Sequence, residues 1–96
     1  MDHKGWQSAI VLYMAQKARK IGRYNEILVD ELAREIERLG YTQQELADRS
    51  GLSRVTIGKM LRLESVMDIG QAHAIAGALG VELSDLTARV DDRLKG

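Results

Sequence analysis

Several residue types are missing from this sequence of 96 residues. It has no cysteine, so disulfide bonds and thiol chemistry are excluded and a cytoplasmic location fits. It also has no proline and no phenylalanine, and no stretch shows the apolar–polar alternation of a strand. The longest apolar run, residues 9–15, is too short to span a membrane, and no secretory cleavage site accompanies it. One small, all-α cytoplasmic domain is therefore predicted.

The chain has no excess of either charge, because 14 basic and 14 acidic side chains cancel. A zero net charge argues mildly against a general nucleic-acid binder. The distribution is uneven: residues 1–24 hold five basic side chains and one acidic, and residues 25–40 hold two and five. Binding to random DNA should therefore be weak, and specific binding would depend on base contacts or on dimerisation.

The spacing of apolar residues predicts six helices, over residues 6–20, 25–39, 43–50, 54–62, 69–79 and 84–94. Asn25, Asp68 and Ser84 are suitable N-caps for the second, fifth and sixth of them. The apolar side chains expected to form the core from the second helix onward are Val29, Leu32, Ala33, Ile36, Leu46, Ala47, Ile57, Met60, Leu61, Ile69, Ala72, Ile75, Ala76, Leu79, Leu86, Val90 and Leu94.

The most informative stretch, residues 42–62, predicts two short helices joined by a tight turn. Thr42 and Glu45 have the spacing of a capping box at the start of the first helix. Gly51 supplies the left-handed conformation that such a turn needs, and Ser53 is a good N-cap for the second helix. This layout allows a protein to place one helix in the major groove of DNA.

One side of the second short helix carries the residues that would meet DNA, namely Arg54, Val55, Gly58, Lys59 and Arg62. Arginine donates twice to guanine, lysine also reaches guanine, and valine or threonine touches a thymine methyl group. We expect Gly58 to allow close approach to a groove wall, since it has no side chain. Residues 53–63 hold three basic residues and no acid, so an uncompensated basic face is predicted.

Residues 42–62 resemble the helix-turn-helix of the lambda-repressor-like (Cro/repressor, XRE-like) family. The matching positions are Gln43, Ala47, Gly51, Leu52 and Ile57. The wider resemblance runs from about residue 25 to residue 86. It implies a five-helix DNA-binding domain, here with an extra N-terminal helix. The family often has a glycine just after the recognition helix where this chain has Leu63, which leaves the path of residues 63–68 open.

The resemblance also implies roles for individual residues. The position of Gln43 usually clamps a phosphate, and the positions of Arg54, Val55 and Lys59 usually face base edges. The complete set of expected DNA-binding residues is Gln43, Gln44, Ser53, Arg54, Val55, Thr56, Lys59 and Arg62. Arg49 is a further candidate for a backbone contact. The competing interpretation is a plain helical bundle in which these basic residues form an ordinary solvated face.

Residues 1–24 form an N-terminal extension to the domain of residues 25–96, and three interpretations compete for them. They would pack back onto the domain, pair with a second subunit, or use Lys17 to Arg23 as a basic arm on DNA. Packing or dimerisation is favoured, because a free surface should not expose as many large apolar side chains as this segment holds, namely Trp6, Ile10, Tyr13 and Met14.

The sequence favours a sequence-specific transcriptional regulator, such as a phage repressor or Cro-like protein, that binds double-stranded operator DNA as a homodimer. It would act in the bacterial cytoplasm and nucleoid or in a phage-infected host. The alternative is an antitoxin or adaptor that binds a partner protein through the N-terminal helix. No enzyme, cofactor or metal site is predicted, since His3 and His73 lack further ligands at metal spacing and no phosphate-binding loop occurs.

Overall fold

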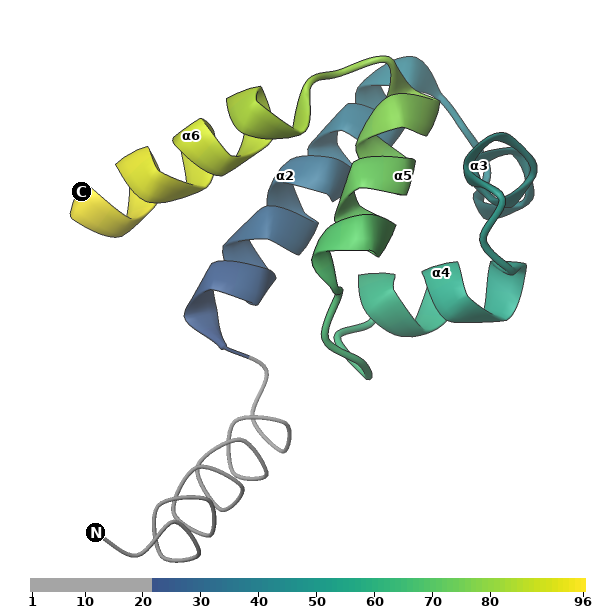
Figure 1. Cartoon of the computed structure of the whole chain (residues 1–96), viewed down its shortest axis with the longest axis horizontal. Helices are drawn as coiled ribbons and strands as arrows, with labels where there is room; N and C mark the ends of the chain where they lie inside the picture. The colour runs from purple at the N-terminus through teal and green to yellow at the C-terminus, as the bar shows by residue number, and fades with distance from the viewer. Residues whose placement is uncertain (1–21) are drawn as a thin grey trace, which may run out of the picture.

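The computed structural model describes residues 22–96, and the predicted helix over residues 6–20 lies outside this range. The described residues form five α-helices and no strands: α2 (Arg23–Leu39), α3 (Gln43–Ser50), α4 (Arg54–Leu61), α5 (Ile69–Leu79) and α6 (Leu83–Lys95). Figure 1 shows α2 and α5 in the centre, with α6 on one side and α3 and α4 on the other. The predicted all-α class is confirmed. No helix among the described residues is long and apolar enough to cross a membrane.

The helix bounds follow the sequence prediction closely, with two corrections at N-caps. Asn25 does not cap α2, because the helix already begins at Arg23 behind Gly22. Asn25 is instead buried, and its Oδ1 accepts a hydrogen bond from the Met67 backbone N–H at 3.1 Å. Ser84 lies inside α6, which begins at Leu83 with Glu82 as N-cap. In both cases the sequence predicted an N-cap, but the helix begins one or two residues earlier and the side chain lies inside it.

The five helices share one core, in which α2 packs against α4, α5 and α6, and α5 packs against α3 and α6. Seven side chains in this core are almost fully buried: Leu32, Leu46, Ile57, Met60, Ile75, Leu86 and Val90. Ile36 and Leu61 are half-buried and pack against its edge. Three predicted core residues are exposed, namely Ala33, Ile69 and Leu94. Ile69 is the first residue of α5 and Leu94 lies in the last turn of α6, so both stand at helix ends where the next element no longer covers them.

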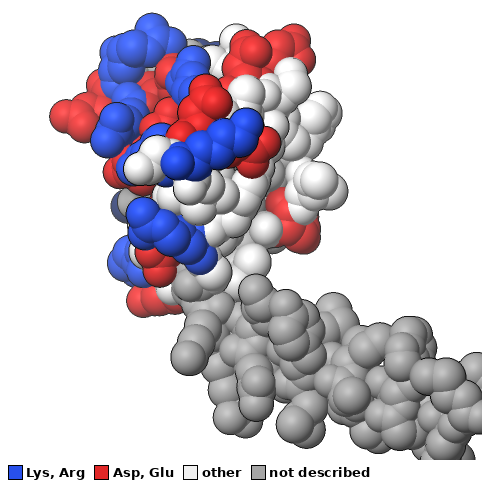
Figure 2. Space-filling view, turned by 90° about the vertical axis from the view of Figure 1, so that its left-hand side faces the viewer, with Lys and Arg blue, Asp and Glu red and all other residues white. Residues whose placement is uncertain are grey.

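Ion pairs join α2 to α6 across the surface of the core. Arg89 Nη1 donates to Glu35 Oε1 at 3.0 Å, and Arg93 Nη1 donates to Glu31 Oε2 at 2.9 Å and to Asp30 Oδ2 at 2.8 Å. The hydrogen bond from Arg93 lowers the pKa of Asp30. Figure 2 shows the two signs of charge crowded together on this side of the molecule, with an uncharged strip beside them. The network fixes α6 against α2 and leaves α3 and α4 at the other end.

Candidate nucleic-acid interface

The first motif helix, α3, begins at the predicted capping box. The Glu45 backbone N–H donates to Thr42 Oγ1 at 3.1 Å, and the Thr42 backbone N–H donates to Glu45 Oε1 at 3.4 Å. The helix ends at Ser50, and its C-cap Gly51 has a φ of 77°, in the left-handed region. These contacts involve only neighbours in the chain, so the local sequence sets the start and the end of α3.

The second motif helix, α4, begins at Arg54, and Ser53 is its N-cap, as predicted. Ser53 Oγ accepts a hydrogen bond from the Thr56 backbone N–H at 3.0 Å and donates one to Thr56 Oγ1 at 2.8 Å. The two hydroxyl groups are therefore already engaged with each other, and Thr56 is half-buried. Both residues position the start of α4 in the described structure.

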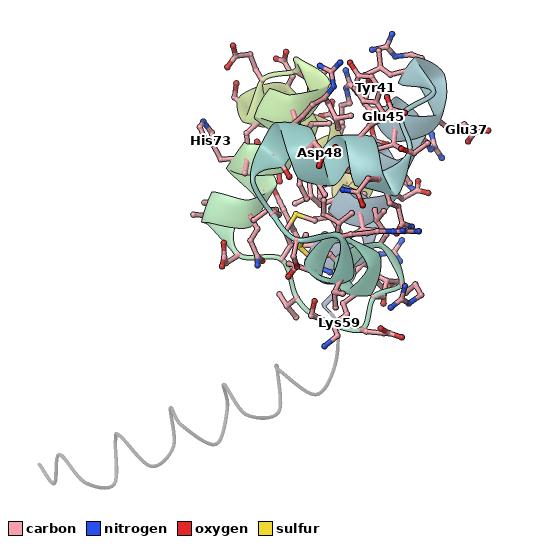
Figure 3. The ribbon with its side chains drawn as sticks, turned by 90° about the vertical axis from the view of Figure 1, so that its right-hand side faces the viewer. Glu37, Tyr41, Glu45, Asp48, Lys59 and His73 are labelled. Atoms are coloured by element: carbon pink, nitrogen blue, oxygen red, sulfur yellow. The ribbon has the colours of Figure 1, made fainter. Side chains whose placement is uncertain are left out.

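Burial on one side of α4 decides which side chains face outward. Ile57 and Met60 have no exposed surface and anchor the helix in the core. Arg54, Val55 and Lys59 are exposed, Val55 to 67%. Figure 3 shows Lys59 pointing away from the body of the protein, below α3. The three residues expected to face base edges are thus brought together on the outer surface of a short, anchored helix.

Gly58 is covered by other side chains, which corrects the sequence prediction that it allows close approach to a groove wall. It is buried, and a Cβ atom at this position would lie 2.8 Å from Arg62 Nη1 and 3.5 Å from Gln43 Oε1. The missing side chain therefore makes room for the ends of two other side chains, one from α3 and one from the end of α4. Gln43 and Arg62 converge above Gly58, next to the exposed face of α4.

The basic face is compensated at its C-terminal end, contrary to the sequence prediction. Arg62 Nη2 donates to Glu64 Oε2 at 2.9 Å. This hydrogen bond, with the charges of Arg62 and Lys59, lowers the pKa of Glu64. Glu64 was missed because it lies just beyond the stretch of residues 53–63, in the segment whose path the sequence left open.

The backbone at Leu63 explains how Glu64 reaches this place. Leu63 adopts a φ of 61°, the left-handed conformation that glycine usually takes after a helix. Its N–H donates to the Met60 carbonyl at 3.1 Å, and the Glu64 N–H donates to the Lys59 carbonyl at 2.8 Å. The chain therefore ends α4 as if a glycine were present, and it turns Glu64 back toward the basic residues.

The remaining candidates on α3 already have contacts within the protein. Gln44 Nε2 donates to Asp48 Oδ1 at 3.0 Å. The Arg49 guanidinium lies 4.6 Å from the centroid of the Tyr41 ring, a cation–π distance. Figure 3 shows Asp48 on the outer side of α3. The surface of α3 is thus less basic than that of α4.

Two cations of α4, Arg54 and Lys59, make no ion pair with any residue between 22 and 96. If DNA bound this surface, few phosphates would be neutralised, and contacts to base edges would have to supply much of the binding. His73 is exposed on α5 (Figure 3), and the described residues contain no group of three or more side chains that could hold a metal ion.

Residues 32–86 match a protein family described as helix-turn-helix. The matched range covers more than half of the chain and includes all of α3, α4 and α5. The chain belongs to this family. Its members are of the XRE, or lambda-repressor-like, type, so the resemblance stated from residues 42–62 is confirmed. No protein of curated function and no solved structure matches the chain.

Membership places this helix-turn-helix protein among DNA-binding transcription regulators. The family domain serves DNA binding and regulation and is not typically enzymatic.

Proposed function

We propose that this helix-turn-helix protein is a sequence-specific repressor of the phage repressor or Cro type, which binds an operator with α4 in the major groove. The observation that carries the proposal is the exposure of Arg54, Val55 and Lys59 on a helix whose opposite side is fully buried. A core-anchored helix presents its outer side chains in fixed positions, as direct reading of base edges requires. The cell cytoplasm, where operator DNA lies, is the proposed location.

Contacts to the DNA backbone would come from residues beside this face. Gln43 is the first residue of α3, where helix N–H groups also favour an anion. Arg62 lies next to it across Gly58, and we assign both to phosphates. Gln44, Ser53 and Thr56 already bond within the protein, so their proposed part is to hold this edge in place and to offer second hydrogen bonds to the backbone.

A homodimer is part of the proposal. Helix α4 has eight residues and is about 12 Å long, so one copy reads only a short sequence. With a net charge of zero, a single copy would also bind weakly. Two copies on inverted half-sites, with their recognition helices about 34 Å apart, would double the contacts.

The direct test is selection from a random duplex DNA pool with the purified chain at near-physiological salt. Enrichment of two inverted half-sites is the expected result, and a pool without any enriched sequence would refute sequence-specific reading. The selected sequence then serves to test Arg54. Arg54→Ala should weaken binding by about 1–3 kcal/mol and relax the preference at one base position.

Arg34→Ala is the matched control, since it removes the same charge from an exposed position on α2, where the guanidinium pairs with Asp30. It should leave the base preference unchanged. If Arg54→Ala weakens binding to operator and random DNA equally, Arg54 contacts the backbone and does not read a base.

A second candidate function is an antitoxin or adaptor that binds a partner protein. The observation in its favour is a group of exposed apolar side chains away from α4, namely Tyr24, Val66 and Ile69. Such a protein should aggregate or stay monomeric when purified alone and become stable with its partner. A self-contained repressor should instead form a stable homodimer.

A further inference from the structure

An apolar groove lies between the start of α2, the loop of residues 66–68, the start of α5 and the N-terminal half of α6. Its volume is about 520 Å³. Tyr24 and Leu28 of α2 line one wall, Val66 and Ile69 line another, and Leu83 closes it on the side of α6. None of the DNA-binding residues assigned above takes part in it.

Two independent observations indicate that something fills this groove. First, its rim holds large apolar side chains in contact with water, with Ile69 exposed to 82% and Val66 to 48%. Second, Asn25 lines the groove and is more than nine-tenths buried, yet its Nδ2 has no hydrogen-bond partner among the described residues. Its Oδ1 accepts a hydrogen bond from the Met67 backbone, so the amide keeps its orientation and both N–H donors of Nδ2 stay unused. Buried donors are normally paired, so the occupant should bring an acceptor as well as apolar surface.

We propose that the groove receives the apolar part of the N-terminal segment, residues 6–16, of a second copy of the chain, and that the two copies exchange these segments. The inference rests on the homodimer of the proposed function and names its interface. The segment has the required chemistry, since Trp6, Ile10 and Met14 are apolar and Tyr13 and Gln16 carry acceptor oxygens.

Position supports this occupant. Gly22, where the described structure begins, is itself part of the lining, so the segment leaves the domain at the groove.

The length of the groove favours a second copy over the same chain. The α2 wall runs from Gly22 to Leu28, about 9 Å at 1.5 Å per residue. In the helix predicted for residues 6–20, the turn next to Gly22 is Lys17 to Lys20, which is basic. Tyr13 would lie about 13 Å from Gly22, beyond the end of the wall. Folding back within one chain would press cations against apolar side chains, whereas a segment from a second copy can place its apolar part there.

Cross-linking tests the exchange directly, because the full chain contains no cysteine and introduced thiols have no competitors. One variant carries Tyr13→Cys and another carries Ile69→Cys, a position exposed enough to tolerate the change. Mild oxidation of the mixture should give a disulfide-linked dimer of the two variants. In the double variant, cross-linked dimers support the exchange, and a cross-link within one chain would overturn it in favour of intramolecular packing.

Sedimentation equilibrium supplies the second measurement. The unmodified chain should be a dimer at micromolar concentration, and Ile69→Asp should raise its dissociation constant at least tenfold. Val55→Asp is the control, since it places the same charge at an exposed apolar position of α4 and should leave the dimer intact. A monomeric unmodified chain, or equal effects of the two variants, would overturn the proposal and leave the groove to another protein or an apolar ligand.

The outcomes of these tests can be distinguished from a failure of the DNA-binding proposal. Selection of a single half-site by a monomer would refute the exchange and keep sequence-specific binding. A cross-linked dimer that enriches no DNA sequence would refute the repressor and keep the exchange.

Discussion

Substituting Gly58 with alanine should raise the stability of the fold and weaken DNA binding at the same time. Glycine in the middle of a helix is less favourable than alanine by about 0.5–1 kcal/mol. The added Cβ would meet Arg62 Nη1 at 2.8 Å, so that guanidinium must move, but it is the far end of a flexible side chain. The contact with Gln43 Oε1, at 3.5 Å, is an ordinary van der Waals distance. We therefore expect the free energy of unfolding to rise by about 0.5–1 kcal/mol, which corresponds to several degrees in Tm for a domain of this size.

DNA binding should respond in the opposite direction, because the displaced Arg62 and the neighbouring Gln43 are the assigned phosphate contacts. Removing the Arg62 charge from its phosphate should make the slope of log K against log salt shallower by about 0.9. Gly77→Ala is the matched control: Gly77 is also inside a helix, a Cβ there meets nothing within 4 Å, and it lies on α5. It should show the gain in stability without a change in DNA binding.

Urea unfolding followed by circular dichroism measures the stability, and fluorescence anisotropy with a labelled operator at several salt concentrations measures the binding. Two results would refute the reasoning. A loss of stability in Gly58→Ala would mean that the groups above Gly58 cannot move aside. Unchanged affinity and salt slope would mean that neither Gln43 nor Arg62 contacts DNA from its present position.

Three further predictions concern the end of α4 and the α2–α6 network. Leu63→Gly should be more stable than Leu63→Ala by about 1 kcal/mol in urea unfolding, because φ is 61° there; a more stable alanine variant would contradict this backbone strain. Glu64→Gln should strengthen DNA binding and steepen the salt slope, since it frees Arg62 and removes a negative charge; weaker binding would show that Glu64 holds Arg62 in its binding position. The lowered pKa values of Asp30 and Glu35 stabilise the fold above the usual carboxyl pKa of about 4, and this stabilisation should be lost as the pH falls through the folded-state values. The free energy of unfolding should therefore differ less between pH 7 and pH 3 in the Asp30→Asn, Glu35→Gln double variant than in the unmodified chain. An equal difference in the two proteins would refute the contribution of these two carboxylates.

In the proposed function, Glu64 and Arg62 would affect how this helix-turn-helix protein selects DNA. An acid at the edge of α4 would repel phosphates on any DNA sequence, while base contacts by Arg54 and Lys59 would help only on the preferred one. Weak binding to random DNA would leave more of the protein available for an operator. The zero net charge of the chain acts in the same direction.

The two motif helices were predictable from the sequence because their signals are local. Thr42 bonds to Glu45 and Ser53 to Thr56, each three residues away, and Gly51 needs no partner to adopt a positive φ. The exposed face of α4 followed from helical periodicity, since burying Ile57 and Met60 leaves Arg54, Val55 and Lys59 outside. The roles assigned to these exposed residues in reading bases stay predictions.

Other features depended on where distant segments pass one another, which no local pattern specifies. Asn25 looked like a helix cap, but the loop before α5, 42 residues away, passes close enough for its amide to hold Met67. Gly58 looked like part of the outer face, but Gln43 from α3 covers it. The turn at Leu63 places Glu64 against Arg62 and compensates the basic face. Short-range hydrogen bonds and periodicity thus determined the helices and the exposed face of α4, whereas tertiary packing decided which polar groups are covered, which charges are paired and where the apolar groove lies.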